Sequence, residues 1–247
     1  MRSAHSRPSR RGFHGVLAVV AAGGLTAAAL VAANANATPA ARGTDCAAVH
    51  VITARASTER PGEGITGALV TQIVNSSDQS VSRASVDYPA TLGNYAGSSA
   101  QGVAALTEQL TDQVQKCPDQ KIVLAGYSQG AHVVLDVLGG GGGGGLGRAT
   151  PPVDASIASH VTAVATFGDP RHVVDQPFDV GTSNRNGLFP RSAAQLKVLA
   201  GLADRIQAFC DSGDTFCDRG ANTAVHLTYL NRYRDDAAEF VLGKIGG

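Results

Sequence analysis

The sequence predicts an α/β fold in one domain, with helices on both faces of a central, mostly parallel sheet. Short apolar segments rich in β-branched residues alternate with segments whose apolar residues recur at helical spacing. The segment KIVLA at 121–125 is nearly continuous in apolar residues, as is typical of a strand buried on both faces of a parallel sheet. No shift in composition divides the 247 residues into two domains, and 43% apolar residues suffice to build one core.

Strands and helices alternate along the whole domain. Apolar, β-branched runs indicate the strands, and apolar residues spaced three and four apart indicate the helices. The expected strands are 48–54, 84–88, 121–125, 161–167 and 205–209, and the expected helices are 65–74, 98–117, 131–138 and 229–241.

Local signals mark several ends of these elements. Ser98 with Gln101 resembles a capping box that begins the second helix, and Pro118 ends that helix. Gly243 is expected to end the last helix. The glycine run at 139–145 is expected to form a long surface loop within the domain. An interdomain linker is the alternative, but the strand that follows the run belongs to the same alternation.

Residues 1–37 have the composition of an export signal. A positively charged start without acidic residues precedes an apolar run at 16–33, and Ala35-Asn36-Ala37 matches a cleavage pattern. We therefore expect a secreted, extracellular protein made of residues 38–247, without a stable membrane anchor. A transmembrane anchor is the alternative, which the short run of alanine and glycine disfavours. The arginine pair at 10–11 leaves open whether export uses the general or the twin-arginine route.

Charge and cysteine content narrow the classes of partner. Lys+Arg and Asp+Glu both number 20, so no basic excess is available to bind nucleic acid. All four cysteines follow the predicted signal, and an even count in an exported chain favours two disulfides. Of three possible pairings, Cys210 with Cys217 is the simplest, which leaves Cys46 with Cys117. Because no C-x2-C pair is present, we expect no zinc site and no other metal.

The pattern G-x-S-x-G at 126–130 lies between an expected strand and an expected helix, which is the context of a nucleophile elbow. On such a turn the hydroxyl of Ser128 stands clear at the carboxyl end of the sheet. The start of the following helix favours developing negative charge there. The alternative is an inert serine in a tight turn. The elbow refines the fold prediction to a three-layer sandwich of the α/β-hydrolase type.

A serine nucleophile needs a base and an acid, which follow it in that fold in the order serine, acid, histidine. His226 is the histidine that follows every plausible acid, so we predict that it is the base. The acid is expected within the segment CDSGDTFC at 210–217, where Asp214 is favoured. Asp211 and Asp218 stay open as alternatives.

The oxyanion of an acyl-transfer reaction needs two hydrogen-bond donors. The backbone N–H of Gln129, directly after the nucleophile, is expected to be one of them. The second is expected from the loop that follows the first strand. Ser57 lies in this loop and offers both its backbone N–H and its hydroxyl.

Five blocks of the sequence resemble the cutinase family of secreted serine esterases. The family often has glycine at the position of Ala56, which is the only departure in these blocks. In chain order the blocks are ARASTE at 54–59, CP at 117–118, GYSQG at 126–130, CDSGDTFC at 210–217 and HLTY at 226–229.

The resemblance implies a lidless, monomeric esterase that works through an acyl-enzyme and needs no cofactor. It implies Ser128 as nucleophile, Asp214 as acid and His226 as base, with Ser57 and Gln129 as the oxyanion hole. The disulfides that it implies are Cys46–Cys117 and Cys210–Cys217.

The substrate is less closely defined by the resemblance, because the family includes cutinases and acetylxylan esterases. We expect carboxylic esters such as cutin-type polyesters, acylglycerol-like esters or short- to medium-chain esters. Removal of acetyl groups from xylan is the alternative, which the polar segment at 218–223 supports. A non-catalytic wall-surface domain is a remote alternative. Residues that would line an apolar rim, or else belong to the core, are Leu188, Phe189, Leu196, Leu199 and Leu202.

Overall fold

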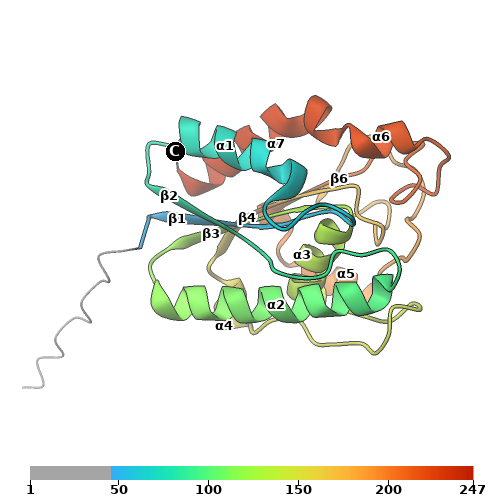
Figure 1. The fold of residues 1–247 in the computed structure, drawn as a ribbon, viewed down its shortest axis with the longest axis horizontal. Coiled ribbons are helices and arrows are strands. Elements are labelled where there is room, and N and C mark those ends of the chain that lie inside the picture. The colour runs from blue at the N-terminus through green and yellow to red at the C-terminus, as the bar shows by residue number, and fades with distance from the viewer. Residues whose placement is uncertain (1–45, 247) are drawn as a thin grey trace, which may run out of the picture. The chain divides into compact units, whose positions relative to one another are not determined.

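A six-stranded sheet forms the centre of the computed structural model, which describes residues 46–246 (Figure 1). The predicted export signal and its cleavage site lie outside these residues. All neighbouring strands pair in parallel. Across the sheet the order is β2 (Val81–Ser85), β1 (Val49–Ala54), β3 (Lys121–Tyr127), β4 (Val161–Phe167), β6 (Ile206–Phe209) and β5 (Asp179–Val180).

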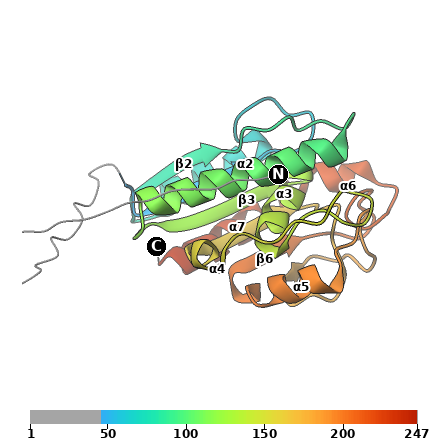
Figure 2. The ribbon, with the colours of Figure 1, turned by 90° about the horizontal axis from the view of Figure 1, so that it is seen from below.

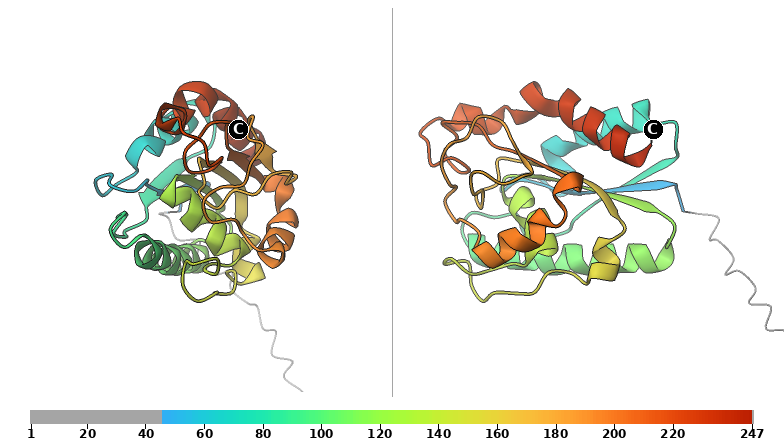
Figure 3. Two further views of the ribbon diagram at one scale, coloured as in Figure 1. Left: turned by 90° about the vertical axis from the view of Figure 1, so that its right-hand side faces the viewer. Right: turned by 180° about the vertical axis from the view of Figure 1, so that it is seen from behind.

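Helices cover both faces of this sheet, which confirms the predicted three-layer α/β fold. One face packs against α1 (Gly67–Ser76) and α7 (Tyr229–Ile245), which also contact each other (Figure 1). Figures 2 and 3 show the helices of the other face. These are α2 (Tyr95–Lys116), α3 (Gln129–Gly139), α4 (Ala155–Ala158) and α5 (Ala193–Ala200).

The remaining turns of helix lie in loops: α6 (Thr223–Leu227) and two 3-10 segments at Gly64–Thr66 and Ala203–Arg205. Among the described residues, no helix combines the length and the apolar character needed to cross a membrane.

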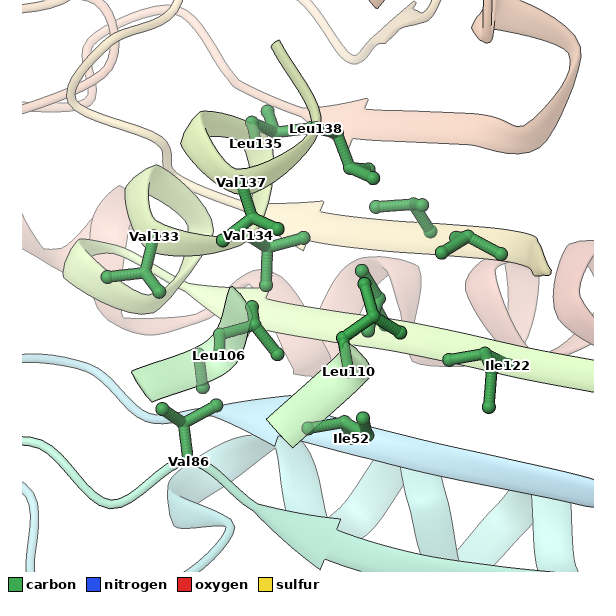
Figure 4. Close-up of a cluster of buried hydrophobic side chains, with 14 of the residues drawn as sticks. Ile52, Val86, Leu106, Leu110, Ile122, Val133, Val134, Leu135, Val137 and Leu138 are labelled. Atoms are coloured by element: carbon green, nitrogen blue, oxygen red, sulfur yellow. The ribbon is translucent and has the colours of Figure 1, made fainter. Parts of the chain in front are cut away.

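Alternating side chains of each central strand build two separate apolar cores. In β3, Ile122 and Leu124 face the core under α2 and α3, whereas Val123 and Ala125 face the core under α1 and α7. Figure 4 shows the first core, in which strand residues such as Ile52 meet side chains from α2 and α3. Full burial of one such aliphatic side chain contributes about 1.5–3 kcal/mol to folding. The two cores therefore stabilise β3, the strand that Ser128 directly follows.

Several predicted ends differ from the observed ones. The second helix begins at Tyr95, and Asn94 caps it by accepting the Gly97 amide at 3.2 Å, so the predicted capping box at Ser98 is wrong. Ser98 is instead buried within the first turns, where its hydroxyl accepts the amide of Thr91. The predicted end of the last helix at Gly243 is wrong, because the helix continues to Ile245 and Gly246, with a φ of 74°, is its left-handed C-cap.

One strand and one helix also shift. The second strand is 81–85 rather than 84–88, because Val81 is already paired with Val49. The first helix starts two residues late, after a 3-10 turn. β5 and the helices at 155–158, 193–200 and 223–227 were not predicted.

Both disulfides implied by the resemblance are present. Cys46–Cys117 joins the residues just before β1 and just after α2, and it closes a loop with a sequence separation of 71. Crosslinking a loop of this length stabilises the fold by roughly 4 kcal/mol through the unfolded state. Cys210–Cys217 closes a short loop after β6, with a separation of 7.

The glycine run forms a hairpin inside the domain, as predicted. Gly141 and Thr150 exchange two backbone hydrogen bonds of 3.1 and 3.0 Å at its base. Leu146 is buried near the tip, whereas a Cβ added at Gly143, Gly145 or Gly147 would touch nothing. The hairpin is therefore anchored at its base and by one side chain.

Candidate active site

Ser128 forms a sharp turn between β3 and α3. Its backbone angles are φ 54° and ψ −115°, a region that a residue with a side chain occupies only when its surroundings enforce it. The flanking glycines make this turn possible. A Cβ at Gly126 would lie 2.5 Å from the Gly130 carbonyl oxygen, and a Cβ at Gly130 would lie 1.9 Å from that of Ala54. The geometry is therefore that of a nucleophile elbow.

Backbone hydrogen bonds hold the elbow against the neighbouring strand. The amide of Ser128 donates to the Phe167 carbonyl oxygen at 2.8 Å, at the end of β4. Its own carbonyl oxygen accepts the His132 amide at 3.0 Å, which closes the first turn of α3. Ser128 thus lies at the positive end of a helix dipole.

Asp214 and His226 form a buried pair at the same end of the sheet. The imidazole Nδ1 lies 2.8 Å from Asp214 Oδ2, and the two residues are 4% and 0% exposed for His226 and Asp214. Asp214 Oδ1 accepts the amides of Phe216 at 2.6 Å and Cys217 at 3.0 Å. Burial raises the pKa of Asp214, but the bonds from His226 and these amides outweigh it and hold the pKa below its ordinary value. The carboxylate therefore stays ionised.

The imidazole of His226 is enclosed by groups that the sequence did not single out. A Cβ at Gly168, which has a φ of 63°, would lie 2.7 Å from His226 Cε1. The ring of Phe216 lies with its centroid 4.4 Å from that of the imidazole. Because Gly168 directly follows Phe167, whose carbonyl holds Ser128, this turn places the imidazole beside the elbow.

The other two acidic candidates have different partners. The Asp211 carboxylate accepts hydrogen bonds from the Thr182 amide and the Tyr233 hydroxyl, and it pairs with the Arg232 guanidinium at 3.0 Å. Asp218 accepts the amides of residues 184, 185 and 213 together with the hydroxyl of residue 183. Both are buried and joined to loops, and only Asp214 contacts a histidine of the candidate site.

Ser57 and Gln129, which are 72 residues apart in the sequence, are joined by a hydrogen bond. The Ser57 hydroxyl donates to Gln129 Oε1 at 2.8 Å, and Gln129 Nε2 donates to Ser99 at 3.0 Å. The Gln129 amide is the first N–H of α3, so no helical carbonyl is available to it. The loop of Ser57 is held by Glu59, whose Oε2 accepts the amide of Ala56 at 2.7 Å.

The remaining described histidines lie away from this constellation. His50 is bonded to Ser82 on the neighbouring strand at 2.7 Å. His132 points into a buried cluster of charges, and His172 lies 3.6 Å from Asp179. Burial lowers the pKa of His172. His160 lies just before β4.

Three exposed leucines lie in segments that connect to residues of the candidate site. Leu227 directly follows His226, and Leu188 donates its amide to the carbonyl oxygen of Phe216. Leu92 lies in the loop whose Ala90 carbonyl accepts the amide of Thr58, next to Ser57. Of the five residues weighed as rim or core, Leu199 is fully buried, Leu196 and Leu202 pack on the core, Phe189 is half-buried against Tyr95, and Leu188 is exposed.

Within residues 46–246, no group of three or more His, Cys, Asp or Glu side chains is arranged to hold a metal ion. The chemistry that the described side chains offer at this site is proton transfer by an imidazole and attack by a hydroxyl.

Comparison with known proteins places these residues in a family. The family model described as Cutinase matches residues 45–245. Cutinase 11 of Verticillium dahliae is 36% identical over 81% of this chain and 70% of its own length. Acetylxylan esterase 2 of Talaromyces purpureogenus is 33% identical over 81% of this chain and 88% of its own.

A solved structure gives the same result. The catalytic core domain of acetyl xylan esterase from Trichoderma reesei superimposes with a TM-score of 0.76, at 31% identity, over 81% of this chain and all of the other. The chain therefore belongs to the cutinase family and is an ester hydrolase.

Proposed function

We propose that Ser128, His226 and Asp214 form the catalytic triad of this esterase. The observation that carries the proposal is the buried 2.8 Å contact between Asp214 and His226 beside the strained turn at Ser128. In the proposed reaction His226 accepts the proton of the Ser128 hydroxyl as its oxygen attacks the ester carbonyl. Asp214 orients the imidazole and stabilises its positive charge.

The backbone amides of Ser57 and Gln129 are proposed to bind the oxyanion of the tetrahedral intermediate. His226 then gives its proton to the departing alcohol, and the acyl group remains on Ser128. A water molecule, deprotonated by His226, hydrolyses this acyl-enzyme and restores the serine. The Gln129 side chain supports the arrangement, because it accepts the Ser57 hydroxyl and thereby fixes that loop.

For the substrate we propose short- to medium-chain carboxylic esters and cutin-type polyesters. The exposed Leu227 and Leu188, at 61% and 39% exposure, offer apolar surface next to the proposed base. Deacetylation of xylan is the second candidate, because two of the relatives carry that activity in their names.

The test is a series of initial rates on p-nitrophenyl esters from acetyl to palmitoyl, beside acetylated xylan, with Ser128→Ala as the blank. The proposal predicts a maximum at butyryl or longer with little acetate released from xylan. A strict preference for acetyl esters with release from xylan would establish the second candidate instead. Activity in the blank equal to that of the wild type would refute the triad.

The proposed enzyme is a monomer released from the cell after cleavage at residue 37. Amino-terminal sequencing of protein from the culture medium tests the cleavage, with Thr38 as the expected first residue. Size-exclusion chromatography with light scattering tests the monomer.

A further inference from the structure

Tyr127 ends β3 and directly precedes Ser128, so its backbone is part of the proposed elbow. This backbone is fixed on one side, because Tyr127 is paired with Phe167 of β4. Its side chain is 2% exposed and belongs to the core beneath α1 and α7. There the phenol hydroxyl donates a hydrogen bond to the backbone carbonyl oxygen of His226.

This contact joins the strand that leads into Ser128 to the helix that carries His226. His226 lies on α6, a helix of five residues within a loop outside the sheet. At the end of a helix the last carbonyl groups lack helical partners, so a donor from outside is needed when they are buried. The Tyr127 hydroxyl supplies one, and its ring meets the imidazole edge to face, with centroids 5.7 Å apart.

We infer that Tyr127 is a positioning residue, whose hydroxyl sets the position of His226 relative to the adjacent Ser128. The inference rests on the proposed function, because it assigns His226 as the base for Ser128. One residue then holds the nucleophile through its backbone and the base through its side chain. Burial raises the pKa of Tyr127 to about 12, so the phenol remains a donor at neutral and moderately alkaline pH.

The test removes this single hydroxyl with Tyr127→Phe. A displacement of about 1 Å in a catalytic group can cost as much as a hundredfold in rate, and we expect kcat for p-nitrophenyl butyrate to fall by roughly tenfold. The KM should stay within about twofold, because the hydroxyl does not touch the substrate. Inactivation by paraoxon should slow by the same factor as kcat, since both need His226 to activate Ser128.

Tyr233→Phe is the matched control. It removes a hydroxyl from the same aromatic cluster, and that hydroxyl is bonded to Asp211 rather than to the proposed triad. Its kcat should stay within about twofold of the wild type, while its melting temperature falls as in Tyr127→Phe. Equal kcat losses in the two variants would show a general structural effect and overturn the inference.

A second variant keeps the test decisive if Tyr127→Phe does not fold. With 4-aminophenylalanine at position 127 a donor is retained, so kcat should return to within about threefold of the wild type. A tenfold loss in this variant, or a folded Tyr127→Phe with unchanged kcat, refutes the positioning role. Activity in Ser128→Ala would instead refute the proposed triad, so the two failures are distinguishable.

Discussion

The described residues include two buried histidine–aspartate pairs, one at the proposed site and one on α3, the helix that follows Ser128. In the first, His226 contacts Asp214 at 2.8 Å. In the second, His132 Nε2 lies 3.0 Å from Asp136 Oδ2. Both residues are on α3, His132 about one turn and Asp136 about two turns after Ser128. By burial and distance alone the two pairs are nearly alike, since all four residues are at most 4% exposed.

Their remaining partners differ. Both nitrogens of His132 are used, because Nδ1 lies 3.0 Å from the Tyr95 hydroxyl. Asp136 is also bound by Arg171 at 2.5 Å and Arg191 at 3.0 Å. Within residues 46–246 no hydrogen bond is observed to Nε2 of His226. Asp214 is bound by that histidine and by the amides of Phe216 and Cys217, and no arginine pairs with it.

The difference shows what makes a histidine available for catalysis. A base needs one nitrogen held by an acid and the other left for the reacting proton. His226 meets this condition, and His132 does not. The second pair instead joins α3 to the segments around Arg171 and Arg191, and so stabilises the helix that follows the proposed nucleophile.

The largest expected effect on kcat comes from replacing His226 by glutamine, and the same replacement at His132 is the comparison. His226→Gln should lower kcat by about 10⁴- to 10⁶-fold, because the proposed base is lost. His132→Gln should cost less than tenfold in kcat but about 1–3 kcal/mol in stability, because buried partners lose a hydrogen bond. Initial rates on p-nitrophenyl butyrate and urea unfolding measure the two effects. A collapse of kcat in His132→Gln with an intact fold would contradict the distinction between the pairs.

A second prediction separates the aspartates of the disulfide loop. Asp214→Asn should lower kcat by about 10⁴-fold, because the amide no longer holds the imidazole in its catalytic tautomer. Asp211→Asn keeps most of its hydrogen bonds and should retain kcat within about tenfold. Comparable kcat losses in both variants would count against Asp214 as the specific acid.

The turn at Gly168 offers a third test, which displaces the imidazole of His226 without replacing any residue of the proposed triad. Gly168→Ala places a methyl group 2.7 Å from His226 Cε1, at a φ of 63°. We expect a loss of about 10²-fold in kcat, since a small displacement of the base is costly. Gly243→Ala is the control, because its added Cβ meets nothing and α7 is helical there. The control should keep full activity and gain up to about 1 kcal/mol of stability.

The smallest expected effect concerns the second pair and pH. Burial raises the pKa of Asp136, but His132, Arg191 and Arg171 outweigh it and lower the pKa to about 2. A depressed acid pKa stabilises the fold above the unfolded value near 4, and this stabilisation is lost as pH falls towards 2.

The wild type should therefore lose about 2 kcal/mol of unfolding free energy from this group as pH falls from 5 to 2. Asp136→Asn should be less stable at pH 5 and should show a shallower dependence on pH. Asp236→Asn, at an exposed site on α7, is the control and should follow the wild type. Parallel curves for Asp136→Asn and the wild type would show that Asp136 is not the titrating group.

The sequence was sufficient to predict the layers and the linear order of the site. Strand and helix periods are local properties, and the motif at 126–130 carries its own turn in its glycines. The choice among Asp211, Asp214 and Asp218 was beyond local reasoning. It depends on which carboxylates are hydrogen-bonded by residues 182–185 and by α7, which are distant from these aspartates or on another element.

Other features were missed for similar reasons. The start of the second helix was misplaced because Asn94 and Ser98 are both good N-cap residues. Asn94 is the cap, and the Ser98 hydroxyl instead accepts the Thr91 amide. β5 has two residues, too few for any period to show. The sequence analysis assigned Gly168 and Phe216 no place around His226, because their contacts with it form only when β4 and the disulfide loop meet.

The glycine hairpin has a practical consequence for protein engineering. Its base is held by Arg171, which donates to the Gly142 carbonyl oxygen at 2.9 Å, and by the paired Gly141 and Thr150. At the tip, a Cβ added at Gly143 or Gly145 would have no other atom within 4 Å. A tag or a small binding domain inserted there would leave the sheet, both cores and the proposed triad unchanged. The hairpin is thus a built-in attachment point for directing the esterase to a chosen surface.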